Sequence, residues 1–137
     1  MYLFKIRPLT IKGYNAAFIK MKTMPTLYHN PRCSKSREAL ALLEAKSCKP
    51  EILLYLETPP TAKQLKTLLA QLDISARELL RKTEDIYKAL NLADEKLSES
   101  ALINAMVANP KLIERPIFIN GDKAVIGRPP ETVLTIL

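Results

Sequence analysis

A short apolar strand, a tight turn and an amphipathic helix follow one another between residues 26 and 46. We expect residues 26–29 to form the strand and Asn30-Pro31 to form the turn. Apolar residues at helical spacing then predict a helix over residues 34–46. Cys33 falls where the strand passes into the first turn of this helix. The sequence therefore predicts an α/β fold that places this thiol at the end of a strand.

The position of Cys33 indicates a reactive thiol. The first N–H groups of a helix are unpaired and carry the positive end of the helix dipole, which stabilises a thiolate and attracts anions. Arg32, Lys35 and Arg37 add positive charge around the same turn. We interpret the segment as a nucleophile that binds its own anionic substrate. The alternative is a small core cysteine beside three solvated charges.

The remaining strands complete a mixed sheet. The apolar run over residues 52–56 is typical of a buried parallel strand, which would close a βαβ unit. Two apolar segments flank Asn120-Gly121-Asp122, a strong signal for a β-hairpin. A closing helix is expected over residues 131–137. Its side chains facing the sheet would be Val133, Leu134 and Leu137.

Residues from about 61 to 109 predict a helical insertion between the two halves of the sheet. Thr61 and Ser75 occupy capping positions, and a further helix, the third or fourth of the insertion, is expected from Ser98. Between them, a helix over residues 84–91 would bury Ile86, Tyr87 and Leu90. The order of elements predicts a thioredoxin-like, mixed four-stranded sheet with a helical insertion.

The net charge of +7 is concentrated in one terminal segment. Residues 1–23 hold five Lys or Arg and no acid, whereas the rest of the chain has 16 basic against 14 acidic residues. We expect residues 1–23 to be a basic extension, either disordered or loosely docked or arising from an upstream start, and residues 24–137 to form the domain. A basic face for nucleic acid is therefore not expected.

Other classes of function are disfavoured by composition. No run of about 18 apolar residues is present, so no membrane span is expected. Two cysteines and a single histidine cannot build a Cys2His2 zinc site within one chain, and no metal is expected. The two cysteines do not form a disulfide framework, which favours a reducing, cytoplasmic location.

Arg81, Arg115 and Arg128 stand at the ends of expected elements, and the last two precede prolines. The planar guanidinium binds oxyanions bidentately and stays charged, so these residues are candidate anion ligands. Each is equally well explained alone by a surface ion pair. The available carboxylates nearby are Glu78, Glu114 and Glu131.

The segment Tyr-His-Asn-Pro-x-Cys-x-x-Ser-Arg at residues 28–37 resembles the active-site signature of the glutaredoxin-coupled arsenate reductases, the ArsC family, and in particular its short chromosomal branch. Leu79-Leu80-Arg81, Arg115-Pro116 and Arg128-Pro129 match further family motifs in order. The resemblance implies that Cys33 attacks arsenate held by the three arginines and forms a thioarsenate adduct. Glutathione as co-substrate and glutaredoxin as partner would complete reduction to arsenite, a step in arsenic detoxification, without a bound cofactor.

We expect supporting roles for His29, Asn30, Ser36 and Pro116, although His29 could instead simply cap the end of the strand. Pro116 would be the cis-proline beside the active cysteine, and His29 would hydrogen-bond the thiolate or tune its pKa. The Ser36 hydroxyl would donate to the thiolate or to the oxyanion, with Asn30 completing the cradle. Because Ser36 replaces a second cysteine, turnover would need an external thiol.

Two alternatives share the same fold. Spx-like regulators bind RNA polymerase, but they usually carry a Cys-x-x-Cys switch that Cys33 and Ser36 cannot form. The other alternative is a thiol reductase of another oxyanion or of a disulfide. The ordered arginines favour an oxidoreductase acting on an oxyanion.

Overall fold

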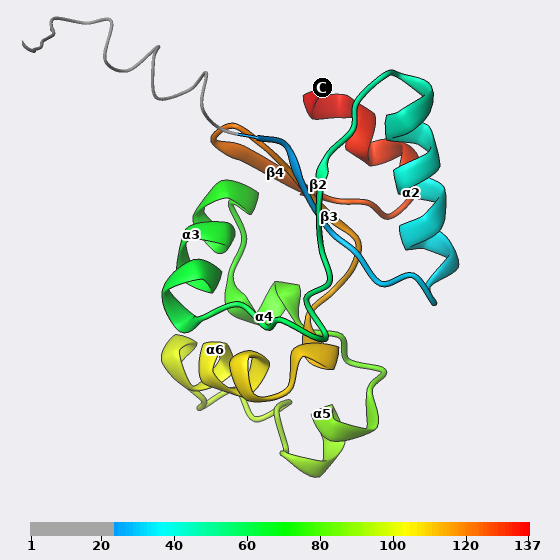
Figure 1. Cartoon of the computed structure of the whole chain (residues 1–137). Coiled ribbons are helices and arrows are strands. Elements are labelled where there is room, and N and C mark those ends of the chain that lie inside the picture. Colours follow the sequence, from blue (N-terminus) through cyan, green and yellow to red (C-terminus); the bar gives the residue numbers. More distant parts are fainter. Residues whose placement is uncertain (1–23) are drawn as a thin grey trace, which may run out of the picture.

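The computed structural model describes residues 24–137, which are organised around a mixed four-stranded sheet (Figure 1). Its strands are β1 (Thr26–Tyr28), β2 (Glu51–Leu53), β3 (Ile117–Asn120) and β4 (Lys123–Ile126). Their order across the sheet is β2-β1-β3-β4, with β1 parallel to β2 and antiparallel to β3. The predicted α/β, thioredoxin-like architecture is confirmed. The predicted extension over residues 1–23 lies outside the described residues.

The two faces of the sheet are covered by different elements. α2 (Ser34–Ala45) and the 3-10 helix η2 (Pro130–Ile136) lie together on one face, and the helical insertion covers the other (Figure 1). Successive side chains of a strand point to opposite faces. Leu27 and Phe118 therefore pack beneath α2, whereas Tyr28 and Ile117 join the core of the insertion.

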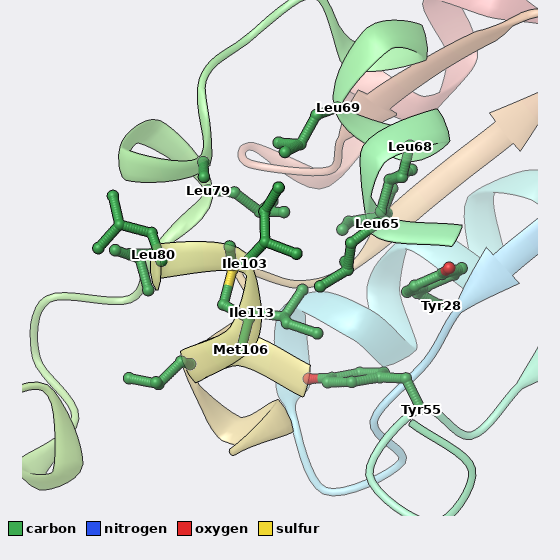
Figure 2. Close-up of a cluster of buried hydrophobic side chains, with 14 of the residues drawn as sticks. Tyr28, Tyr55, Leu65, Leu68, Leu69, Leu79, Leu80, Ile103, Met106 and Ile113 are labelled. Atoms are coloured by element: carbon green, nitrogen blue, oxygen red, sulfur yellow. The ribbon is translucent and has the colours of Figure 1, made fainter. Parts of the chain in front are cut away.

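The insertion forms the larger hydrophobic core (Figure 2). Its elements are α3 (Ala62–Leu72), α4 (Ala76–Leu79), α5 (Asp85–Ala89), α6 (Glu99–Ala108) and the 3-10 helix η1 (Pro110–Leu112). Thr61 and Ser75 cap α3 and α4 in capping boxes, and Ser98 caps α6, as predicted. None of the helices between residues 24 and 137 is long and apolar enough to cross a membrane.

The predicted buried strand over residues 52–56 is wrong in part. Only Glu51–Leu53 pair with β1, and β2 is an edge strand in which Ile52 is 41% exposed. The chain turns away after Leu53, and Tyr55 is buried in the insertion core rather than in the sheet. An apolar run does not distinguish a central strand from an edge strand that continues into a buried loop.

Two predicted core positions are also wrong, each because of helix length or type. α5 ends at Ala89, so Leu90 is exposed and Leu92 is buried in its place. The closing helix is a 3-10 helix with three residues per turn, so Ile136 rather than Leu137 shares a face with the buried Val133. Leu137 is 52% exposed.

The predicted hairpin is confirmed. Asn120 pairs with Lys123, which leaves Gly121 and Asp122 as a two-residue turn. Gly121 has a φ of +68°, a conformation that glycine adopts without steric cost. The hairpin places Pro116 and Gly127, the residues flanking its open end, beside each other.

Candidate active site

Cys33 is the N-cap residue of α2, in an extended conformation that ends the active-site turn. The turn is held locally, because the Asn30 side-chain oxygen accepts a hydrogen bond of 3.1 Å from the backbone N–H of Arg32. The Asn30 carbonyl accepts the N–H of Cys33 at 2.9 Å. Arg37 closes the loop by donating to the carbonyl of Pro31 at 2.9 Å. These bonds direct the cysteine to the positive end of the helix.

The surroundings of Cys33 favour its thiolate. Burial, the largest single influence, raises the pKa of the thiol. Interactions with the backbone N–H of Ser36, the Arg115 side chain, the backbone N–H of Lys35 and the Arg115 charge lower it. The net pKa of Cys33 lies below its ordinary value. A helix start and an arginine thus act together on the thiol, which remains partly exposed.

Arg115 and Arg128 meet at Cys33 because β3 and β4 are antiparallel. Ile117 pairs with Ile126, so the residues just outside the hairpin converge at the same edge of the sheet. Arg128 donates from Nη2 to the Cys33 sulfur at 3.8 Å and from Nε to the Arg115 carbonyl at 2.7 Å. The bond between Arg115 and Pro116 is cis, as the resemblance implies, and so is the bond after Arg128.

The three candidate arginines are joined by two carboxylates into one chain of ion pairs. Glu84 lies 3.7 Å from Arg115 and 3.3 Å from Arg81. Glu114 lies 2.7 Å from Arg81 and 3.2 Å from Arg128. Arg81 therefore reaches the site through the carboxylates, whereas Arg115 and Arg128 act directly on the thiol.

Glu84 was not anticipated from the sequence, and Glu114 was expected only as one partner of a surface pair. The expected pairs with Glu78 and Glu131 do not form among the described residues. An isolated β-bridge between Leu80 and Ile113 aligns the two segments and brings Arg81 beside Glu114. The sequence gives only a weak signal for this bridge, because each of the two segments has two apolar residues followed by a charged residue, Arg81 in one and Glu114 in the other.

His29 and Ser36 form a buried pair behind the cysteine. The His29 Nδ1 and Ser36 Oγ atoms share a hydrogen bond of 2.8 Å, and Ser36 Oγ also accepts the Asn30 N–H at 3.0 Å. Burial and then the charge of Arg37 lower the pKa of His29, so the imidazole is neutral at pH 7. The Ser36 hydroxyl thus contacts His29 and Asn30, and the backbone N–H of Ser36 is the group that acts on Cys33.

The second cysteine lies away from this site. Cys48 follows the C-terminal end of α2, packs against the smaller core and has a pKa raised by burial. Between residues 24 and 137, no group of three or more His, Cys, Asp or Glu side chains is arranged to hold a metal ion. The chemistry that this part of the chain offers is that of a single activated thiol surrounded by arginines.

A mixed four-stranded sheet with a cysteine at a helix start and a cis-proline just before β3 defines a protein of the thioredoxin-like fold class. Residues 28–136 match the model of the ArsC family, and the chain belongs to that family.

Relatives from several bacteria share nearly the whole described region. The chain is 62% identical over 112 residues to the uncharacterized protein YfgD of Escherichia coli K12, covering 81% of this chain and 94% of the relative. It is 52% identical over 112 residues to an arsenate reductase of Haemophilus influenzae, an alignment that covers 81% of this chain and 97% of the relative. The structure of an arsenate reductase from Vibrio cholerae superposes with a TM-score of 0.82 at 51% identity. The match covers 85% of this chain and 100% of that structure's chain.

Proposed function

We propose that this protein reduces arsenate to arsenite with glutathione and glutaredoxin. The observation that carries the proposal is the contact of Arg128 with the Cys33 sulfur at 3.8 Å, beside Arg115 and within the ion-pair chain that includes Arg81. A low-pKa thiolate and several guanidinium groups at one point suit attack on a tetrahedral oxyanion. Relatives at 43% to 52% identity are named arsenate reductases.

The first step is attack of the Cys33 thiolate on arsenic(V). A sulfur–arsenic bond forms and one oxygen leaves as water after protonation, so arsenic keeps its oxidation state. Arg115 and Arg128 hold the remaining oxygens and offset their charge. Arg81 acts on this step through Glu84 and Glu114, the carboxylates that it shares with Arg115 and Arg128.

Reduction then requires two external thiols, because Ser36 cannot supply a disulfide partner. Glutathione bonds to arsenic and displaces a second oxygen as water. The glutaredoxin thiolate attacks the glutathione sulfur, and the electron pair of the sulfur–arsenic bond stays on arsenic, which becomes arsenic(III). Water releases arsenite from Cys33, and glutaredoxin carries away the mixed disulfide.

The test is arsenate-dependent oxidation of NADPH in the presence of glutathione, glutathione reductase and glutaredoxin. We expect wild-type protein to support it and the Cys33→Ser variant to lose it, while Cys48→Ser retains it. No oxidation above the level of Cys33→Ser would refute arsenate reduction. The same assay with other oxyanions or with disulfides in place of arsenate would then identify a different substrate for the thiol.

A further inference from the structure

A cleft of about 260 Å³ lies at the active-site turn, and of the candidate oxyanion ligands only Arg115 contributes to its described lining. Arg115 and Glu84 contribute to its wall, and Arg32 and Lys111 border it from two separate segments, the active-site turn and η1. A neighbouring cleft of about 300 Å³ shares Asn30, Arg32 and Leu56 with it. Both clefts are lined by residues of the turn that carries the nucleophile.

The charges around the first cleft favour an anion. Among the described residues that line it, Glu84 is the one carboxylate, and Glu84 is already paired with Arg81 at 3.3 Å and with Arg115 at 3.7 Å. The neighbouring cleft has Glu57 in its lining. Among residues 24–137, the side chains of Arg32 and Lys111 make no ion pair or hydrogen bond. Two positive charges therefore border the cleft without a protein partner and are available to the carboxylates of a ligand.

The cleft is also placed to serve the thiol. Arg115, whose positive charge lowers the pKa of Cys33, lines it, and Arg32 precedes Cys33 in the chain. Its volume is slightly below the roughly 300–1,000 Å³ of pockets for drug-sized ligands, so it suits one end of a peptide-sized molecule. Tyr55 and Leu56 supply an apolar wall for the aliphatic part of such a molecule.

We infer that this cleft binds the thiol co-substrate, a small thiol bearing carboxylates such as glutathione, and that Arg32 and Lys111 hold those carboxylates. The inference rests on the proposed function, in which glutathione reacts at the same site. In this arrangement the ion-paired arginines and the unpaired cations bind different ligands. The paired arginines bind the oxyanion, and the unpaired Arg32 and Lys111 select the thiol.

The experiment follows glutathionylation of Cys33 by glutathione disulfide, which needs no arsenate. The Cys33 thiolate attacks one sulfur, the disulfide breaks, a mixed disulfide forms on Cys33 and glutathione thiolate leaves. The rate is measured by mass spectrometry in a Cys48→Ser background. The same rate with hydroxyethyl disulfide, which is uncharged, reports the intrinsic reactivity of Cys33. The ratio of the two rates isolates recognition of the carboxylates.

We expect Arg32→Ala and Lys111→Ala each to lower this ratio about two- to fivefold, as for loss of one exposed ion pair, and the double variant to lower it further. Added salt should reduce the ratio in the wild type. The control is Lys82→Ala, an exposed lysine outside the cleft, which should leave the ratio unchanged.

An unchanged ratio in the Arg32 and Lys111 variants would overturn the inference, as would an equal loss in Lys82→Ala. The outcome separates from that of the proposed function. If the variants change the rate ratio as expected but the protein reduces no arsenate, the thiol site is supported and arsenate is refuted as the substrate. If the protein reduces arsenate but the rate ratio is the same in all variants, the proposed function is supported and this cleft is refuted as the thiol site.

Discussion

The guanidinium of Arg81 lies 2.7 Å from the Glu114 carboxylate, although the two residues are 33 positions apart. The same carboxylate oxygen lies 3.2 Å from Arg128, so Glu114 links the insertion to the end of the hairpin. The side chains of Arg81 and Glu114 are 15% and 25% exposed. Because Glu114 pairs with both Arg81 and Arg128, it orients the two arginines relative to each other.

We predict that Glu114→Gln lowers kcat/KM for arsenate about tenfold, equivalent to ~1.4 kcal/mol of transition-state stabilisation. Arg128 would keep its bond to the Arg115 carbonyl but lose the carboxylate that fixes its Nε, and Arg81 would keep only Glu84. A small displacement of the arginines that bind the substrate is enough to lower the catalytic rate by this factor. Steady-state kinetics at varied arsenate would measure the effect.

The matched control is Glu131→Gln, which removes an exposed carboxylate near Arg128 in sequence that makes no ion pair between residues 24 and 137. It should leave kcat/KM within about twofold of wild type, as expected for a surface substitution. Equal activity of the Glu114 and Glu131 variants would show that Glu114 has no part in positioning the arginines.

The second prediction concerns the pH dependence of Cys33. Because its pKa is lowered, the thiolate should be populated at lower pH than in a model thiol, and alkylation by iodoacetamide should rise at correspondingly lower pH. Arg115→Gln removes a positive charge that lowers the pKa of Cys33, so it should raise this pKa and slow alkylation at pH 7. The two proteins should converge at alkaline pH, where both thiols are ionised.

Cys48 provides the internal comparison for this titration. Burial raises its pKa, so in a Cys33→Ser background alkylation should require higher pH than for Cys33. The rates are measured from pH 5 to pH 10 with the other cysteine replaced by serine. Identical profiles for Cys33 and Cys48 would exclude activation of Cys33 by the helix and by Arg115.

The third prediction tests the buried pair behind the nucleophile. Ser36→Ala leaves His29 Nδ1 and the Asn30 N–H without their shared partner, so the free energy of unfolding should fall by ~1–3 kcal/mol. Urea unfolding of this variant beside Ser34→Ala, at an exposed position in the same turn, would measure it. A loss no greater than that of Ser34→Ala would mean that the pair does not hold the active-site turn.

Local signals in the sequence were sufficient for most of the fold. The hairpin at Gly121 and the capped helices starting after Thr61 and Ser75 depend on neighbouring residues, and they form as predicted. Strand β2 was misjudged because an edge position is a property of the whole sheet. Leu137 was misjudged because the closing helix is a 3-10 helix.

The sequence indicated several of the residues that the structure brings together around Cys33, but not the contacts between them. Cys33 and the arginines carry recognisable motifs, whereas the carboxylates that join the arginines come from segments aligned by a single β-bridge. No local pattern encodes a pairing across 33 residues. The contact of His29 with Ser36 rather than with the thiol likewise depends on how the active-site turn is folded.

The last prediction concerns the glycine between the hairpin and Arg128. A Cβ at Gly127 would lie 2.9 Å from the Pro116 ring and 3.1 Å from Val133, so Gly127→Ala must displace one of them. Such overpacking destabilises by ~1–3 kcal/mol. Because Pro116 directly follows Arg115 and Gly127 directly precedes Arg128, we expect kcat/KM for arsenate to fall as well. Thermal unfolding and the coupled assay measure the two effects.

Gly121→Ala separates this crowding from a general effect of replacing glycine. Gly121 has open space around its Cα but a φ of +68°, so alanine there should cost ~1–2 kcal/mol through backbone strain alone. The turn lies at the far end of the hairpin from Arg115 and Arg128, and kcat/KM should be unchanged. Two variants of similar stability should thus differ in activity. Equal activity in both would show that the contact between Gly127 and Pro116 does not position the arginines.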